Sequence, residues 1–281
     1  MGFMGICTLC GKTATLQSSH YLPAAFFRRL HSGGLPPTLL DAQAVVYRAR
    51  QPQAHLLCGK CEHRFKTQGE DWVIDCTCKT TGGFPLRDLL LRNEPVGSMS
   101  PNVATAFWYH GARLPKVRHS EIIYFAASVF WRGCAYDWSR VDSGLSRLEF
   151  TQALEAEFRS FLLGKAAFPS SVLLQVEVAF DPFLSGQRLG IIFPSRIVPR
   201  GPTAGARPGG DFFALCGMIF SLYFDLGRPG GLEWGKVTSI AEPPHPLLLT
   251  NVRMSEVAAA HQELESTATP KGRLARPQTR R

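Results

Sequence analysis

No stretch of this sequence is long and apolar enough to span a bilayer. The longest uncharged apolar run, 212–224, has 13 residues and lies between Asp211 and Asp225, whereas a membrane-spanning helix needs about 17–25 residues. The first residues also lack the charged, apolar and small-residue regions of a secretory signal. We therefore expect a soluble cytoplasmic protein with no membrane partner.

Two common catalytic motifs are also missing. The chain contains neither a G-x-x-x-x-G-K-[ST] loop nor a G-x-S-x-G elbow, so a P-loop nucleotide hydrolase and a standard serine hydrolase have no support. Charged residues make up only 19% and hydrophobic residues 45%, which excludes a wholly disordered chain. The 31 Lys and Arg against 22 Asp and Glu give a net charge of +9, and this excess indicates a polyanionic partner.

The cysteines carry the strongest signal in the sequence. Eight cysteines without a secretory signal favour metal binding or free thiols over disulfides. Four of them form two Cys-x-x-Cys pairs, Cys7 with Cys10 and Cys58 with Cys61. Each short turn presents two thiolates to one ion, so the pattern predicts a structural zinc. The spacer of 47 residues is longer than the usual 15–20, and we expect it to hold structure of its own.

The other four cysteines have different settings. Cys76 and Cys78 are too closely spaced for a zinc turn; they are either a redox pair or two half-buried thiols, and we favour the thiols. Cys134 and Cys216 lie in apolar contexts and are expected to pack as small hydrophobic residues.

The composition divides the chain into three parts. We predict a zinc-binding module over 1–95, a helical and then β-rich domain of unknown role over 96–265, and a disordered basic tail over 266–281. The fold class is therefore α+β: an N-terminal zinc-stapled ββα-metal-like module, then helices, then a C-terminal antiparallel β-rich region.

Periodicity assigns the elements of the second part. Helical spacing predicts helices over 121–132 and 148–163, with Gly164 as the stop. Alternation predicts strands over 172–180 and 189–198, and a Gly- and Pro-rich connector follows over 199–210. The run 212–224 is predicted to be one or two buried strands because Gly217 interrupts it. Trp131 and Trp138 could stack on bases, but the helical spacing around them favours the core.

A resemblance to a known family lies around the two cysteine pairs. His20 with Pro23 follows the first pair, and Lys66 follows the second. This arrangement over 4–72 resembles the HNH (ββα-metal) endonuclease family in its zinc-stapled form, which occurs in bacterial defence loci and mobile elements. In that family a strand ends in a catalytic His, and the second Cys-x-x-Cys opens a helix that carries a metal ligand and a basic residue.

The resemblance implies a metal-dependent endonuclease that acts on DNA. His20 would be the general base, Glu62 the ligand of a catalytic Mg²⁺ or other divalent cation, and His63 the alternative ligand. Zinc would be structural. The residues expected to contact phosphate are Arg28, Arg29, Arg64 and Lys66.

This chain departs from the family pattern at three positions. Ser19 stands where the family usually has an acidic residue or His. The central Asn that orients the catalytic His has no clear counterpart. Glu62 replaces the commoner His or Asn, although a carboxylate is a good Mg²⁺ ligand.

Two other functions compete with the nuclease. The first is a non-catalytic zinc-binding nucleic-acid module, and the second is a protein-interaction scaffold whose partner meets the aromatic β-rich region. His20 could be only a packing residue, or it could lie next to the zinc. Glu62 and His63 could begin a solvated helix face, and the basic residues could form another.

Overall fold

The computed structural model describes residues 2–32, 38–41, 44–47, 51–79, 83–99, 106–180, 183–184, 187–188, 191–197, 210–224 and 239–250. The predicted basic tail at 266–281 lies outside these residues. So does the predicted connector at 199–210, except for Gly210, which begins a strand.

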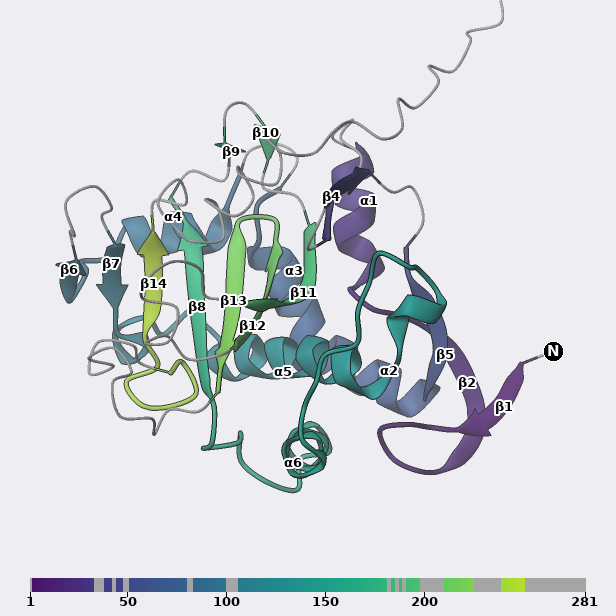
Figure 1. The fold of residues 1–281 in the computed structure, drawn as a ribbon. Helices are drawn as coiled ribbons and strands as arrows, with labels where there is room; N and C mark the ends of the chain where they lie inside the picture. The colour runs from purple at the N-terminus through teal and green to yellow at the C-terminus, as the bar shows by residue number, and fades with distance from the viewer. Residues whose placement is uncertain are drawn as a thin grey trace, which may run out of the picture.

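A seven-stranded sheet forms the centre of the molecule (Figure 1). Its order is β11-β12-β13-β8-β14-β7-β6, and β8 and β14 run parallel whereas the other neighbours are antiparallel. The prediction of an antiparallel β-rich region was therefore incomplete: strands from before the long helix join the sheet, and one pair is parallel. The strands are β6 (Gly97–Met99), β7 (Ala106–Tyr109), β8 (Leu173–Ala179), β11 (Ile191–Ile197), β12 (Gly210–Leu215), β13 (Met218–Tyr223) and β14 (Leu247–Thr250).

The predicted apolar run 212–224 forms the hairpin β12–β13. Cys216 and Gly217 are its turn residues, with φ of 43° and 88°. Positive φ at both central positions is the geometry of the tight turns that suit twisted hairpins. The prediction of one or two buried strands is confirmed, and the structure has two, which meet at Gly217.

The two predicted helices of the second part are present. Helix α5 (His119–Ala135) crosses the sheet (Figure 1), and Phe125 and Phe130 contact Phe213 on β12. Helix α6 (Gln152–Leu162) begins after Thr151, whose hydroxyl accepts the Leu154 N–H, and the chain leaves it through Gly164 at φ +71°. Glycine adopts this conformation without the steric cost that a side chain adds.

A second, three-stranded sheet holds the N-terminal cysteines. Its order is β1-β2-β5, all antiparallel, with β1 (Phe3–Ile6), β2 (Thr13–His20) and β5 (Gln53–Cys58). One helical run follows β5 directly: α2 (Gly59–Phe65), the π-helical turn η1 (Lys66–Glu70) and α3 (Asp71–Cys76). The spacer between the cysteine pairs has structure of its own, as predicted, in α1 (Ala24–Ser32), β3 (Thr38–Asp41) and β4 (Ala44–Tyr47).

The remaining elements are short. They are helix α4 (Pro85–Leu91), the 3₁₀ turns η2 (Gly111–Arg113) and η3 (Trp138–Arg140), and the two-residue strands β9 (Phe183–Leu184) and β10 (Gln187–Arg188).

The small sheet shares one apolar core with the rest of the molecule. Tyr21 stacks on Trp138 with ring centroids 4.4 Å apart, Phe26 meets Phe125, and Phe65 meets Trp131. Both tryptophans are fully buried, so they are core residues rather than surface platforms for bases. Buried side chains from both sides of residue 95 belong to this core, and the division of the chain into a module over 1–95 and a domain over 96–265 stays a prediction.

Gly69 lies where the helical turn η1 packs closely against helix α5. A Cβ at this position would lie 2.8 Å from the backbone N of Phe125 on α5, so the helices touch only because the side chain is missing. We expect Gly69→Ala to cost about 1–3 kcal/mol of unfolding free energy, measured by urea denaturation. Gly59→Ala is the matched control in the same helical run, since its Cβ would meet only the Gln17 amide at 3.8 Å. Equal stability of the two variants would contradict this account.

Candidate metal centre and histidine site

The four paired cysteines converge on one point. Their Sγ atoms lie within 4.8 Å of one another, and Cys10 Sγ is 3.9 Å from Cys58 Sγ. Tetrahedral zinc with Zn–S bonds of about 2.3 Å places its sulfurs about 3.8 Å apart. The donor set and spacing therefore fit a metal ion such as zinc.

Backbone hydrogen bonds shape the first cysteine turn. The Gly11 N–H donates to the Cys7 carbonyl at 2.8 Å, and the Cys7 N–H donates to the Lys12 carbonyl at 2.9 Å. Gly11 has φ +74°, which glycine accommodates at little cost. The Cys58 N–H in turn donates to Cys7 Sγ at 3.3 Å. This hydrogen bond joins the second cysteine pair to the first.

The thiols have opposed ionisation tendencies. Burial raises the pKa of Cys7 and of Cys61. Burial also acts to raise the pKa of Cys10, but the Lys12 backbone N–H and the neighbouring thiols outweigh it and lower that pKa to about 7. Four thiolates at this spacing need a cation to offset their charge, which is what a metal ion provides.

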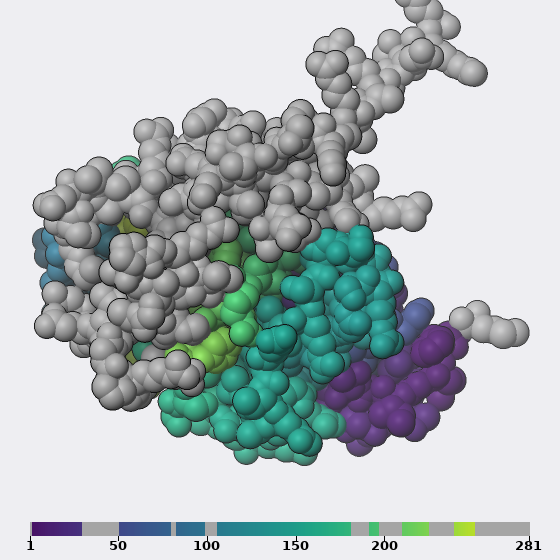
Figure 2. Space-filling view, viewed as in Figure 1, coloured from purple at the N-terminus to yellow at the C-terminus, as the bar shows by residue number. Residues whose placement is uncertain are grey.

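Helix α6 covers this centre. Arg159 Nε donates to the Leu9 carbonyl inside the first cysteine turn at 2.6 Å. From the other side, Arg64 Nη1 on α2 donates to the Leu163 carbonyl at 3.1 Å. In the space-filling view the N-terminal strands adjoin the teal surface that includes this helix (Figure 2). The C-terminal end of α6 is therefore hydrogen-bonded both to the first cysteine turn and to helix α2.

His20 lies at the other end of the β2–β5 pair from the cysteines, half-buried and directly opposite Gln53. The ladder between β2 and β5 is interrupted after Gln17, where Leu56 has no partner. Ser19 points inward beyond this bulge, and its Oγ accepts the Leu57 N–H at 3.2 Å. Bulges re-aim the side chains that follow them, and here the bulge fixes Ser19 as a structural residue.

A buried ion pair joins helix α5 to the helical turn η1. Arg132 Nη2 on α5 is 2.7 Å from Glu70 Oε1 on η1, and the two side chains are only 2% and 13% exposed. The Arg132 guanidinium also lies over the Phe65 ring, 4.7 Å from its centroid. Arg132 Nε and Nη1 are buried without a hydrogen-bond partner among the described residues.

These charges act on the imidazole of His20. Burial lowers its pKa below 6.5, the positive charges of Arg132 and Arg28 lower it further, and Glu70 acts in the opposite direction. A lowered pKa keeps the ring neutral near pH 7, which a general base requires. Because the pKa of His20 is lower in the folded protein than in the unfolded chain, protonation of His20 decreases the free energy of unfolding as the pH falls below 6.5.

Sequence reasoning missed Gln53, Glu70 and Arg132. The only signal for Arg132 was its position as a lone charge at the end of an apolar helix, because such a buried charge needs a partner. Glu70 and Gln53 carried no signal in the sequence, since the contacts that define them come from other elements.

The two predicted cation ligands, Glu62 and His63, differ in how far they are buried. Glu62 is half-buried, and its Oε1 is buried without a hydrogen-bond partner among the described residues. His63 is exposed on α2. The only group of three or more metal-ligating side chains within the described residues is the four cysteines. A second cation would therefore rely on one or two side chains with water, as Mg²⁺ commonly does.

Three of the four predicted phosphate contacts already have partners in the protein. Arg29 Nη1 donates to the Ile74 carbonyl and Thr77 Oγ1, both at 2.7 Å. Arg64 caps α6 as described, and Lys66 forms an exposed ion pair with Asp71 at 2.7 Å. Arg28 is exposed. Phosphate contact by all four stays a prediction.

The remaining cysteines lie apart from the metal-ligating group. Cys134 and Cys216 are buried as predicted; Cys76 is half-buried and Cys78 is buried. Burial raises the pKa of the Cys76 thiol to about 11, so it is a poor nucleophile at neutral pH.

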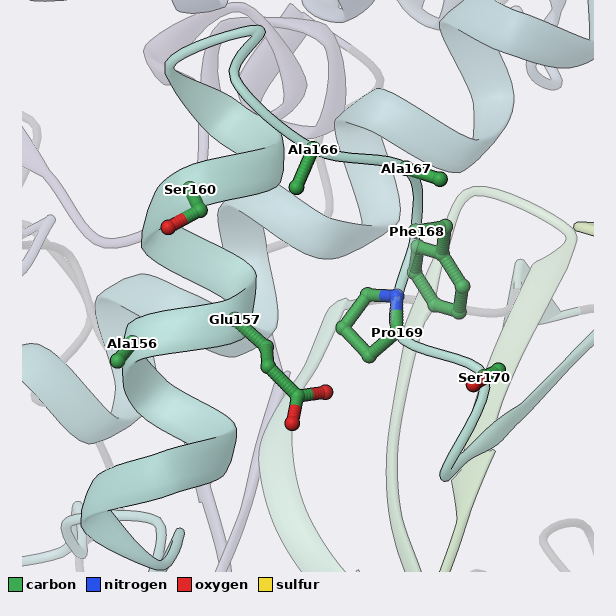
Figure 3. A pocket seen from close by; sticks show the side chains of 8 residues that line it. All are labelled: Ala156, Glu157, Ser160, Ala166, Ala167, Phe168, Pro169 and Ser170. Atoms are coloured by element: carbon green, nitrogen blue, oxygen red, sulfur yellow. The ribbon is translucent and has the colours of Figure 1, made fainter.

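A hollow of about 390 Å³ lies between α6 and the segment 166–170 (Figure 3). None of the predicted site residues lines it. The lining residues are Ala156, Glu157, Ser160, Ala166, Ala167, Phe168, Pro169 and Ser170.

Comparison with known proteins adds no assignment: no protein-family model, no curated protein and no solved structure matches this chain. Within the described part of the chain, no helix is both long and apolar enough to cross a membrane.

The charges around His20 predict a measurable shift. Arg28→Gln removes one positive charge that lowers the pKa of His20, so we expect that pKa to rise toward 6.5 in an NMR titration. Arg113→Gln, which changes an exposed arginine outside the group that acts on His20, is the control. A fall in the His20 pKa in Arg28→Gln, or an equal rise in both variants, would contradict this assignment.

Proposed function

We propose that this protein is a metal-dependent endonuclease of HNH type that hydrolyses phosphodiester bonds of DNA. The observation that carries the proposal is the position of His20 at one end of an antiparallel pair of strands. Four thiols that fit a zinc ion tie the other end of this pair to helix α2. Strand, strand and helix thus follow the order that the resemblance implies.

His20 would act as the general base. Its burial and the charge of Arg132 favour the neutral ring, and a neutral ring can accept a proton from water as that water attacks phosphorus. The bond from phosphorus to the leaving oxygen breaks as the new bond to the water oxygen forms. A divalent cation, when bound, would stabilise the charge that develops on the phosphate oxygens.

Glu62 is the preferred ligand for that cation, with His63 as the alternative. Glu62 has a buried carboxylate oxygen that no described residue hydrogen-bonds, and burying such an oxygen is costly unless a cation or donor meets it. The exposed guanidinium of Arg28, whose charge acts on His20, is best placed to meet a DNA phosphate.

The test is nicking of supercoiled plasmid by the purified protein with Mg²⁺, Mn²⁺ or Ni²⁺, or with a chelator. We expect cleavage only with a divalent cation. Glu62→Ala should need a higher cation concentration or lose cleavage, whereas His63→Ala should cleave like the wild type. No cleavage with any of these cations would contradict the proposal, and loss in His63→Ala alone would assign the ligand to His63.

One observation favours a second function, protein interaction. The edge strand β1 exposes Phe3, Met4 and Ile6, and an apolar edge strand is a typical surface for pairing with another chain. A partner on the β-rich region stays a prediction. Retention of DNA in a gel shift that weakens with salt, without cleavage, would instead support the non-catalytic nucleic-acid module.

A further inference from the structure

Three polar side chains form a chain of hydrogen bonds that ends on His20. Gln53 stands directly across the ladder from His20, and its Nε2 lies 2.9 Å from His20 Nε2. On the other side, Ser18 Oγ donates to Gln53 Oε1 at 2.8 Å. A backbone hydrogen bond joins the two segments just beyond this pair, since the Tyr21 N–H donates to the Pro52 carbonyl at 3.1 Å. Gln53 therefore occupies the Nε2 edge of the imidazole.

This contact determines which ring nitrogen is available to other groups. With the amide as placed, its NH₂ donates to His20 Nε2, so the neutral ring carries its proton on Nδ1. Rotating the amide by 180° exchanges its O and N within the same space. Gln53 Oε1 then accepts His20 Nε2–H, the amide NH₂ donates to Ser18 Oγ, and Nδ1 keeps a free lone pair.

We propose that Gln53 is the positioning residue of His20, and that in the reactive form its Oε1 accepts the Nε2–H so that Nδ1 is the basic nitrogen. This inference rests on the proposed nuclease function and names a residue for a role that the sequence left unassigned. The proton of the attacking water passes to Nδ1, and the imidazolium that results keeps its Nε2–H bonded to Gln53. The water oxygen bonds to phosphorus, and the leaving oxygen takes its proton from solvent.

The rotated amide satisfies every group in the chain. The Ser18 hydroxyl both donates and accepts, so it accommodates either orientation of Gln53. Gln53 and Ser18 are exposed, which lets the amide turn without repacking the core. Hydrogen-bond partners that orient metal-ligating histidines commonly contribute about 10- to 100-fold to metal affinity or activity, and we expect the same range for Gln53.

Two readouts test the proposal on the full-length protein. Long-range ¹H–¹⁵N correlation of the imidazoles reports which nitrogen carries the proton, and plasmid nicking with Mg²⁺ reports activity. In the wild type we expect neutral His20 as the Nε2–H form. Gln53→Leu should lower the Nε2–H fraction to that of an imidazole without a partner, and it should slow cleavage about 10- to 100-fold with little change in KM. Gln53 is exposed, so we expect Gln53→Leu to preserve the fold.

Gln53→Glu separates positioning from a merely structural role. Its carboxylate can only accept, so it should hold the Nε2–H form, keep cleavage and move the acidic limb of the pH profile to higher pH. His55, an exposed histidine on the same strand, is the internal control whose tautomer should not respond to either variant.

The outcomes separate this inference from the nuclease itself. A Gln53-dependent Nε2–H form in a protein that cleaves no DNA would support the positioning and contradict the proposed function. A wild type in the Nδ1–H form, or Gln53→Leu that cleaves at the wild-type rate, would overturn the inference while cleavage still supports the nuclease.

Discussion

Cys58→Ser is expected to release the bound metal and to unfold the small sheet with helix α2. Cys58 ends β5, precedes α2 and holds its Sγ 3.9 Å from Cys10 Sγ. A structural zinc in small zinc-binding peptides contributes about 10–16 kcal/mol, which is comparable to the whole stability of a domain, about 5–15 kcal/mol. Because the small sheet shares its core with α5, loss of the metal should also destabilise the packing around α5.

The measurement is metal content by mass spectrometry together with urea denaturation. We expect one zinc per chain in the wild type and none in Cys58→Ser, with loss of a cooperative transition. Cys76→Ser is the matched control, because Cys76 is a half-buried thiol outside the metal-ligating group, and it should keep its zinc and its stability. Full metal content in Cys58→Ser would contradict the four-cysteine site.

Glu70→Ala should destabilise the protein by about 3–5 kcal/mol, because it leaves the Arg132 charge buried without its partner. Arg132 is 2% exposed and bonds to Glu70 at 2.7 Å, so solvent cannot replace the carboxylate. The same change removes the one charge that raises the pKa of His20, and that pKa should fall further.

Two further variants show whether the effect belongs to the buried pair. Lys66→Ala breaks the exposed pair with Asp71 on the same helical run and should change stability by less than about 1 kcal/mol. The double variant Glu70→Gln with Arg132→Met removes both charges and should recover much of the loss, since apolar replacements of buried pairs are often tolerated. Equal losses in Glu70→Ala and Lys66→Ala, measured in urea, would contradict this reading.

The elements that the sequence predicted well are those with strong local signals. The apolar face of 121–132 indicated α5, and Gly217 marked the turn between β12 and β13. The two Cys-x-x-Cys turns indicated the metal centre because each turn carries half of the donor set.

The features that the sequence did not predict depend on contacts between distant segments. The parallel pairing of β8 with β14 joins strands separated by the β11–β13 segment and has no periodic signature. Gln53 reaches His20 only because the two strands pair in one register. Glu70 meets Arg132 because η1 and α5 approach at Gly69.

If His20 is the base of the proposed nuclease, replacing it should remove plasmid nicking, and two histidine variants measure this. Wild type, His20→Ala and His55→Ala, each with its bound zinc counted, would be incubated with supercoiled plasmid and Mg²⁺ at pH 7. The account predicts equal zinc in all three, wild-type nicking by His55→Ala, and nicking by His20→Ala that is slower by about 100-fold or more. Nicking by His20→Ala at the wild-type rate would contradict the account.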